Sequence, residues 1–268
     1  MRKIAHISDI HFGTEDFSIT EGLINDLNII APDVLVVSGD LTQRARNNQF
    51  VKAGLFLSRL NFSQIIIPGN HDIPLFDIIR RLFTPLKRYN RFITENMYPF
   101  FEDDEIAILG INTARSLAWK EGRISAEQIN NIDKLLCEVS NEKFKILVTH
   151  HPFIPPPESH GIKIVGRSVL ALKTIEKCHV DLLLAGHLHH GYSGDIRSYY
   201  PSAESSIISV QAGTAISRRR RNELNAYNLI TSDKNTINIE IRTWNGECFF
   251  PVSTAGYKLV NKEWIKST

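Results

Sequence analysis

The chain alternates between short apolar runs and longer segments in which apolar residues recur every three or four positions. Nearly continuous apolar runs are typical of parallel strands that are buried on both faces of a sheet. Apolar residues recur every three or four positions, as in an amphipathic helix, in the segments between these runs, at 21–31, 47–60, 125–139 and 166–178. Strands that alternate with helices of this length predict βαβ units and a largely parallel sheet, so the predicted fold class is α/β.

Six of the apolar runs end in polar residues that are able to bind a metal or a phosphate. They read KIAHISDIHFG, DVLVVSGD, QIIIPGNHD, EIAILGINTAR, FKILVTHHP and DLLLAGHLHH. In open α/β sheets, ligands bind beyond the carboxyl ends of the strands. The polar ends of these runs are therefore predicted to converge on one site.

The pattern changes after about residue 205, where apolar runs follow one another without long helices. The runs SSIISVQAG, NAYNLITSD and TINIEIRTWNG are typical of strands, and residues 233–235 and 245–246 are typical of hairpin turns. We expect this C-terminal part, about 205–250, to form a second, mainly antiparallel sheet. Segments of about 73–100 and 151–168 are expected to be insertions near the site, within one domain spanning residues 1–268.

Composition and charge narrow the function classes. Of the 268 residues, 43% are hydrophobic and 22% are charged, and the net charge of +2 gives no general reason to expect nucleic acid or an anionic membrane as partner. No apolar window approaches the roughly 18 to 20 residues of a membrane span. Cys137, Cys178 and Cys248 are far apart and odd in number, which argues against a disulfide framework and a thiolate metal site. We expect a cytoplasmic protein in a reducing compartment.

The residues at the strand ends suit a site that holds two metal ions. Their nitrogen and oxygen ligands suit Mn, Fe, Zn or Co. Asp9 and His11 are two positions apart, as are His187 and His189, so both members of each pair can turn to one side of an extended segment. The two oxygens of Asp40 could bridge cations about 3.5 to 4 Å apart, the separation typical of two-metal phosphoryl-transfer enzymes.

These motifs, in this order, resemble those of the calcineurin-like metallophosphoesterases, and among them the bacterial class III cyclic-nucleotide phosphodiesterases. GINTARS, GRISAEQI and the FFP that follows TWNGE resemble the same branch, so the resemblance covers nearly the whole chain. It implies a four-layer α/β/β/α sandwich of two mixed β-sheets flanked by helices, the metallo-dependent phosphatase fold. It also implies a homodimer as one expected assembly, although no stripe in the sequence marks an interface.

The resemblance further implies which residues bind each metal. The first metal would be bound by Asp9, His11, Asp40 and His189, and the second by Asp40, Asn70, His150 and His187. The neighbouring His151 and His190 are expected to be bystanders. Whether His189 or His190 completes the first set stays open at this point.

The expected catalytic residues are His71 and Asp40. Two divalent or trivalent ions (Mn²⁺, Fe²⁺ or Fe³⁺, or Zn²⁺) would lower the pKa of a bridging water and so supply a hydroxide nucleophile. By the resemblance, His71 of the GNHD motif would act on the leaving oxygen, as a general acid or as an electrostatic stabiliser. An acid role needs a compensating group, and Asp72 is adjacent.

The residues predict a dinuclear metal-dependent phosphohydrolase, and the resemblance points to a small phosphodiester substrate such as a 3′,5′-cyclic nucleotide. One alternative is the related UDP-diacylglucosamine pyrophosphohydrolase, although its third motif reads GNRD where this chain has GNHD. A broad phosphomonoesterase and a repair nuclease are others. A further alternative is not an enzyme but a noncatalytic binding scaffold of the same fold. The chain retains every expected type of metal ligand, and this argues against a scaffold.

Four residues are expected to contact the substrate: Asn70, His71, Arg115 and Arg218. Arg115 ends the apolar run EIAILGINTAR, and Arg218 opens the one dense run of charge, residues 218–221. That run is interpreted either as a solvated loop or as an edge that contacts phosphate, because arginine pairs bidentately with phosphate oxygens. His160, in the expected insertion, is a further candidate that would reach over the site from a lid.

Overall fold

Two β-sheets face each other in the computed structural model, which describes residues 1–156, 161–219 and 223–267. The first sheet has the order β13-β12-β11-β10-β1-β2-β3. Its strands are β1 (Arg2–Ile7), β2 (Val34–Val37), β3 (Ser63–Ile66), β10 (Ala226–Ser232), β11 (Thr236–Trp244), β12 (Phe249–Val260) and β13 (Glu263–Lys266). Its β1, β2 and β3 are parallel, and the remaining neighbours pair antiparallel.

The second sheet has the order β4-β5-β6-β7-β9-β8. Its strands are β4 (Phe100–Glu102), β5 (Ile106–Gly110), β6 (Phe144–Val148), β7 (Leu182–Ala185), β8 (Tyr192–Asp195) and β9 (Ile208–Gln211). The four central strands are parallel, and β4 and β8 pair antiparallel at the two edges. Both sheets are therefore mixed.

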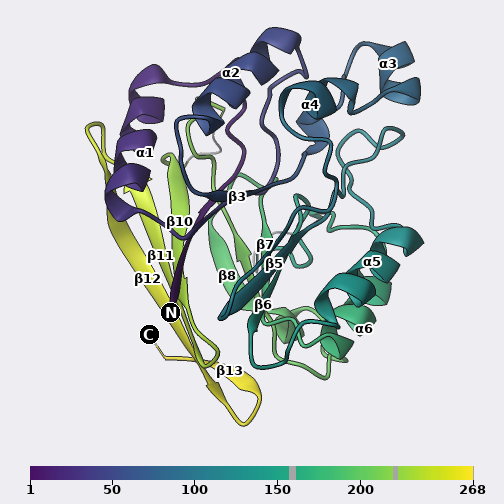
Figure 1. The fold of residues 1–268 in the computed structure, drawn as a ribbon, viewed down its shortest axis with the longest axis vertical. Coiled ribbons are helices and arrows are strands. Elements are labelled where there is room, and N and C mark those ends of the chain that lie inside the picture. The colour runs from purple at the N-terminus through teal and green to yellow at the C-terminus, as the bar shows by residue number, and fades with distance from the viewer. Residues whose placement is uncertain (157–160, 220–222, 268) are drawn as a thin grey trace.

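Helices cover the outer face of each sheet, as Figure 1 shows for α5 and α6 beside β5 to β7. The helices are α1 (Phe17–Ile30), α2 (Asn47–Leu57), α3 (Ile78–Phe83), α4 (Lys87–Phe92), α5 (Ala126–Leu136) and α6 (Ser168–Lys177), with single 3₁₀ turns at η1 (Asn70–Asp72) and η2 (Ile196–Ser198). The expected helices correspond to α1, α2, α5 and α6. None of the helices in the described part of the chain combines the length and the apolar character that crossing a membrane requires.

Alternation along the strands builds the four layers. Val34 and Val36 of β2 point into the core between the sheets, whereas Leu35 and Val37 point into the core beneath α1 and α2. In β7, Leu182 and Leu184 line the inter-sheet core and Leu183 packs under α5 and α6. Because successive side chains of a strand point to opposite faces, a continuous apolar run fills two cores at once. The expected four-layer α/β/β/α sandwich is confirmed.

The C-terminal strands differ from the expectation of a second, mainly antiparallel sheet. Strands β10 to β12 extend the first sheet, because β10 pairs directly with β1. The strand from the SSIISVQAG run, β9, lies instead in the second sheet, parallel to β7. Ile208 and Val210 of β9 thereby join the core between the sheets. Local patterns identify strands, but which strand pairs with which is decided by burial across the whole fold.

Two short helices lie in the segment expected to be an insertion, residues 73–100. The helices α3 and α4 have six residues each. Fewer than two helical turns give too few repeats for a period of 3.6 to stand out in the sequence. Both lie at the end of the molecule where α2 also lies (Figure 1).

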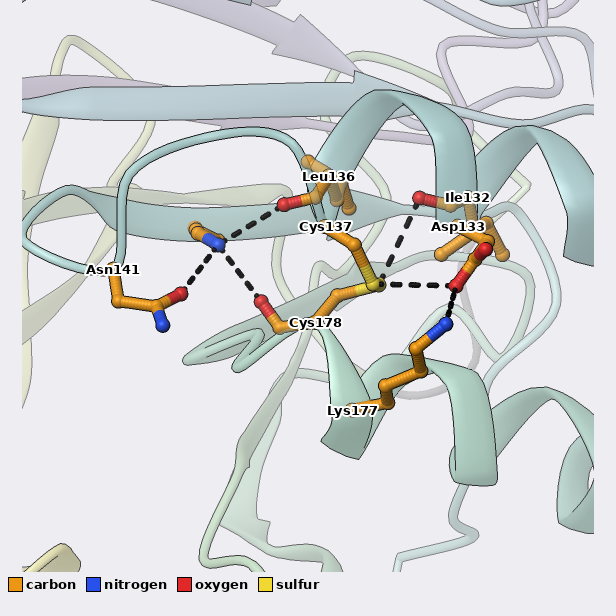
Figure 2. Close-up of a disulfide and its surroundings, with 8 residues drawn as sticks. Ile132, Asp133, Leu136, Cys137, Asn141, Lys177 and Cys178 are labelled. Carbon is orange, nitrogen blue, oxygen red and sulfur yellow. Dashed lines mark hydrogen bonds and ion pairs between the residues drawn. A yellow bond between two sulfur atoms is a disulfide. The ribbon is translucent and has the colours of Figure 1, made fainter.

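The expectation that no cysteines pair is wrong. Cys137 and Cys178 form a disulfide across 41 positions of sequence, shown in Figure 2. The helices α5 and α6 pack on the same sheet, and each ends one residue before its cysteine. The buried Nζ of Lys145 donates to the carbonyl oxygens of Leu136 and Cys178, at 3.0 and 2.9 Å, which ties the two helix ends together a second time. Sequence spacing alone cannot show that two distant helix ends meet.

A thiol titration tests this bridge. We expect the protein denatured without reductant to show one reactive thiol, that of the exposed Cys248, and three after reduction. The Cys248→Ser variant serves as control and should show no reactive thiol without reductant and two after reduction. Closing a loop of this length restricts the unfolded chain, so reduction should lower the free energy of unfolding by about 2–4 kcal/mol. Three thiols without reductant would contradict the bridge.

Candidate metal centre

Five loops that follow parallel strands bring the predicted ligands to one end of the sandwich. The first sheet contributes three of them, after β1, β2 and β3, and the second sheet contributes two, after β6 and β7. In order, these loops hold Asp9 and His11; Asp40; Asn70 and His71; His150; and His187 and His189. The two sheets therefore meet at one cluster of carboxylate, amide and imidazole groups.

An unusual backbone conformation is shared by most of these residues. Asp9, His11, Asp40, His187 and His189 all have φ between 44° and 72°. Non-glycine residues seldom adopt this left-handed region, although aspartate and histidine are enriched among those that do. Backbone of this kind persists only where surrounding structure enforces it, and it clusters at functional sites. Each strand turns sharply at its end, so that the next side chains face the cluster.

The first group of ligand atoms comes from Asp9, His11 and His189. The Oδ1 atom of Asp9 lies 3.5 Å from Nε2 of His11 and 3.7 Å from Nε2 of His189. The rings of His11 and His189 stack with their centroids 5.2 Å apart. All three residues are buried. Their ligand atoms lie within 4.8 Å of one another, a spacing that a single ion between them could span.

The second group is arranged around His150. Its Nε2 atom lies 3.4 Å from Oδ1 of Asp40 and 3.2 Å from Oδ1 of Asn70. The ring of His187 lies against that of His150, with centroids 5.1 Å apart. The structure thus brings Asn70, His150 and His187 to the side of Asp40 that faces the second sheet's loops.

Asp40 lies between the two groups. Its Oδ2 faces Nε2 of His11 at 3.7 Å, whereas its Oδ1 faces Nε2 of His150. The backbone N–H of His71 donates to Oδ1 at 2.8 Å, which fixes the orientation of the carboxylate. A carboxylate with one oxygen toward each group is placed to serve both.

Two buried polar atoms in the cluster have no hydrogen-bond partner within the described residues, namely Asp9 Oδ1 and His11 Nε2. A buried polar atom without a partner is costly. Both atoms point into the first group, where a cation would satisfy them, and nitrogen with oxygen donors suits Mn, Fe or Zn. The residues present therefore fit a bound metal.

Oxygen atoms behind the imidazoles fix their orientation. Nδ1 of His150 donates to the carbonyl oxygen of Ser38 at 2.8 Å, and Nδ1 of His189 lies 2.6 Å from the hydroxyl of Thr214. Each contact leaves Nε2 directed toward the cluster, where that of His150 faces Asp40 and Asn70. Histidines that bind metals generally use their second nitrogen in this way. Thr214 and Ser38 are contributors that the strand-end pattern does not reveal, because neither is metal-competent.

His151 and His190 lie beside the cluster in different environments. Both ring nitrogens of His151 are engaged, Nδ1 with the hydroxyl of Thr113 at 2.8 Å and Nε2 with the carbonyl oxygen of Lys120 at 3.0 Å. The His190 ring is half exposed and forms an ion pair with Glu223. His151 therefore has no nitrogen left for the cluster and the half-exposed His190 contacts Glu223, whereas His189 presents Nε2 to Asp9.

Two opposing effects set the pKa values in the cluster: burial, which disfavours the charged form, and the close approach of carboxylates to imidazoles, which favours it. Burial would raise the pKa of Asp40, but the imidazoles of His150 and His71 hold it well below its usual value. Burial would lower the pKa of His150, but the Asp40 carboxylate raises it to about 9. For His187, burial and the neighbouring His150 lower the pKa to about 3. The carboxylates are thus ionised at neutral pH, as ligands of a cation must be.

His71 lies at the edge of the cluster, against Arg219 of the charged run 218–221. Its Nδ1 lies 3.0 Å from the carbonyl oxygen of Gln43, so Nδ1 carries the proton and donates. Its Nε2 lies 2.8 Å from Nη1 of Arg219, which can only donate, so Nε2 accepts. Burial, the largest effect, lowers the pKa of His71. In this arrangement the imidazole is neutral.

Asp72 does not reach the ring of His71. Its carboxylate accepts from the backbone N–H groups of Leu41, Thr42 and Gly69, at 2.8 to 3.1 Å. Burial, followed by the nearby Asp40 carboxylate, raises the pKa of Asp72 to about 6. Asp72 therefore joins the loops after β2 and β3. Its carboxylate does not pair with the His71 ring, so it does not stabilise a protonated His71.

The remaining predicted residues lie farther out. Arg218 pairs with Asp16 at 3.2 Å, and its contact with the substrate stays a prediction. Arg115 donates to Gln128 and to the carbonyl oxygens of Asn112 and Ala114, beside a separate pocket. His160, Arg220 and Arg221 lie outside the described residues.

A cavity of about 170 Å³ opens directly beside Asn70 and His71. It is lined on its other sides by Gln43, Arg44, Ile73, Leu75, Trp119, Lys120 and Arg219. Three of these side chains are cationic, and within the described lining none is acidic. The chemistry next to the cluster thus favours an anion.

Comparisons with known proteins agree with this geometry. The family model described as calcineurin-like phosphoesterase matches residues 2–191. A probable cyclic nucleotide phosphodiesterase of Vesicomyosocius okutanii is 22% identical over 69% of this chain and 78% of its own length. The glycerophosphodiester phosphodiesterase GpdQ of Enterobacter lignolyticus is 32% identical over 57% of each chain.

Solved structures share the fold. The purple acid phosphatase PPD1 of yellow lupin superposes with a TM-score of 0.67 at 14% identity, over 94% of this chain and 53% of its own. A dimetal phosphatase of Danio rerio superposes with a TM-score of 0.64 at 12% identity, over 94% of this chain and 98% of its own. The predicted metallo-dependent phosphatase fold is thereby confirmed.

Adjacent histidines provide a matched test of the cluster. We expect His189→Ala to lower manganese binding at the first group by at least about tenfold, because it removes the free Nε2 beside Asp9. His190→Ala should bind manganese as the unaltered protein does. Metal content after loading, measured by mass spectrometry, and the thermal shift on adding manganese report this without any substrate. Loss of metal in the His190 variant instead would reverse the assignment.

Proposed function

Because this chain belongs to the calcineurin-like phosphoesterase family and is a metal-dependent phosphoesterase, we propose that it hydrolyses a small phosphodiester, with a 3′,5′-cyclic nucleotide as the leading substrate. The observation that carries the proposal is Asp40, which presents one oxygen to each of two groups of ligand atoms. The cationic cavity beside His71 supports an anionic substrate. Relatives named for two different phosphodiester substrates support a diester.

In this proposal the two groups hold two metal ions that share Asp40. Asp9, His11 and His189 would complete the first set, and Asn70, His150 and His187 the second. Two such ions, when bound, activate water for attack on phosphorus and offset the negative charge of the phosphoryl oxygens. Mn, Fe and Zn all suit the donors, and manganese is the ion that we propose for reconstitution.

The roles proposed for His71 and Arg219 follow from their contact. A neutral His71 whose Nε2 accepts a hydrogen bond from Arg219 has no proton on that nitrogen to donate. We therefore propose that His71 orients Arg219 and stabilises charge, and that it is not a general acid. The guanidinium that it holds is placed at the cavity, where it would donate to a phosphoryl or leaving oxygen. Arg219 thus takes the substrate role expected for Arg218.

The alternatives fit less well. A UDP-diacylglucosamine substrate is disfavoured by the third motif, which reads GNHD in this chain where that enzyme has GNRD. A phosphomonoester would fit the cavity, so the monoesterase is tested directly below. A noncatalytic scaffold would not need buried Asp9 and His11 atoms that are left without partners among the described residues.

A homodimer is a further part of the proposal, and the cytoplasmic location expected from the sequence is tested through the state of the cysteines. The bridge between Cys137 and Cys178 counts against a reducing compartment, because disulfides are rare there. The state of these thiols in freshly lysed cells, trapped by alkylation, decides the compartment. Light scattering of the purified protein decides the assembly.

A panel of substrates tests the reaction class. With manganese bound, we expect an aryl phosphodiester and cyclic AMP to be hydrolysed at least about tenfold faster, in kcat/KM, than an aryl phosphomonoester or a UDP-linked lipid. The expectation rests on relatives that are named for diester substrates, because the three cationic side chains of the cavity favour an anion of either charge. Faster turnover of the monoester would make the protein a phosphomonoesterase.

Neighbouring arginines test the substrate contact. Arg219→Ala should lower kcat/KM for the diester by roughly ten- to a hundredfold, because a hydrogen bond to a charged group stabilises by about 1.5–3 kcal/mol. Arg218→Ala, which removes an exposed pair with Asp16, should change kcat/KM less than about twofold. Equal losses in both variants would show that the local loop, and not the guanidinium of Arg219, is responsible.

A further inference from the structure

Three large apolar side chains project into solvent from the segment that contains α3. Phe76, Ile79 and Phe83 are 76%, 74% and 80% exposed. Ile79 and Phe83, four positions apart in α3, lie on one side of the helix, and Phe76 precedes the helix by two residues. Single exposed apolar residues are normal on protein surfaces. Three exposed neighbours form an apolar patch of the kind that marks an interaction site.

A second segment extends the patch. Leu117 and Trp119, in the loop after β5, are also exposed. The buried guanidinium of Arg81 stacks on Trp119 at 5.3 Å and donates to carbonyl oxygens of Pro74 and Ala118, so it fastens this loop to the α3 segment. The set of Phe76, Ile79, Phe83, Leu117 and Trp119 is called the apolar rim below.

The apolar rim lies at the mouth of the cavity beside His71. Leu75 and Trp119 line that cavity, and each lies in one of the two segments that form the rim. Arg44, a third lining residue, stacks on the Phe76 ring at 5.5 Å. Figure 1 shows α3 standing out at the periphery of the molecule, away from both sheets. Any surface that covers the rim therefore also faces the mouth of the cavity.

The rim lies in a basic stretch of the chain. Residues 73–92 contain five basic side chains (Arg80, Arg81, Lys87, Arg88 and Arg91) and one acidic side chain (Asp77), a local charge of +4 in a protein whose total is +2. The loop at 115–120 adds Arg115 and Lys120. The near-neutral total thus conceals a local concentration of positive charge.

The positive charge around the apolar rim distinguishes between two possible binding partners, a second copy of the chain and a lipid bilayer. A second copy of the chain, packed by two-fold symmetry, would place the same basic segment against itself, and like charges across an interface oppose association. Exposed aromatic and aliphatic side chains among lysines and arginines suit the boundary of an anionic lipid bilayer, where the apolar groups enter and the cations meet the headgroups.

We propose that the apolar rim docks the protein onto anionic lipid bilayers, with the mouth of the cavity facing the membrane surface. The proposal goes beyond the phosphodiesterase activity and does not depend on it. Apolar contact and attraction of basic side chains act together, so binding requires both the rim and anionic lipid. It should weaken as salt screens the charges.

Vesicle co-sedimentation of the whole protein tests the proposal. We expect binding to vesicles of phosphatidylcholine mixed with phosphatidylglycerol to be at least about tenfold tighter than to phosphatidylcholine alone. The double variant Phe76→Ser and Phe83→Ser should lose about tenfold or more of this binding. The matched control is Phe17→Ser with Ile29→Ser, which removes equally exposed apolar side chains from α1 and should bind as the unaltered protein does.

Three outcomes would overturn the proposal. These are equal binding to both kinds of vesicle, equal losses in the two double variants, and a protein that ignores vesicles but forms a dimer that the Phe76 and Phe83 changes dissociate. The circular dichroism spectrum and the melting temperature of the Phe76 and Phe83 variant should match those of the unaltered protein, which shows that it is folded. An Asp40→Ala variant should still bind vesicles, so failure of the catalytic assignment and failure of docking are told apart.

Discussion

Two carboxylates, those of Asp9 and Asp40, are buried at the point where the two sheets meet, and the placement of the surrounding side chains follows from that constraint. A buried carboxylate is costly unless partners replace the water that it loses. In this protein the partners are imidazoles: those of His11 and His189 face Asp9, and that of His150 faces Asp40. A cation that displaced the proton of His150 would find imidazole and carboxylate ligands in place, so the arrangement that reduces the cost of burial also prepares a cation site.

The scaffold holds this cluster together through its backbone. The N–H groups of Asp9 and His11 donate to the carbonyl oxygens of Gly39 and Asp40, which fixes the loop after β1 against the loop after β2. Asp72 binds the loop after β2 from the other side. With both loops fixed, the left-handed backbone of Asp9, His11 and Asp40 is maintained, and the side chains are directed inward.

Local sequence predicts what each strand end contributes, because an apolar run and the residues after it are local features. The helices α1, α2, α5 and α6 and the apolar strands are predicted for the same reason. Features that depend on distant contacts are not predictable in this way: the pairing of β10 with β1, the bridge between Cys137 and Cys178, and the turn that sends Arg219 rather than Arg218 toward His71. Adjacent arginines have identical patterns, and only the fold distinguishes them.

The central claim is that Asp40 joins two cations in one centre. Electron paramagnetic resonance of the manganese-loaded protein tests it most directly, since two Mn²⁺ ions about 3.5–4 Å apart and bridged by a carboxylate are magnetically coupled. The account predicts two manganese ions per chain and the spectrum of a coupled pair. One ion per chain, or two ions that give the separate signals of isolated Mn²⁺, would contradict it.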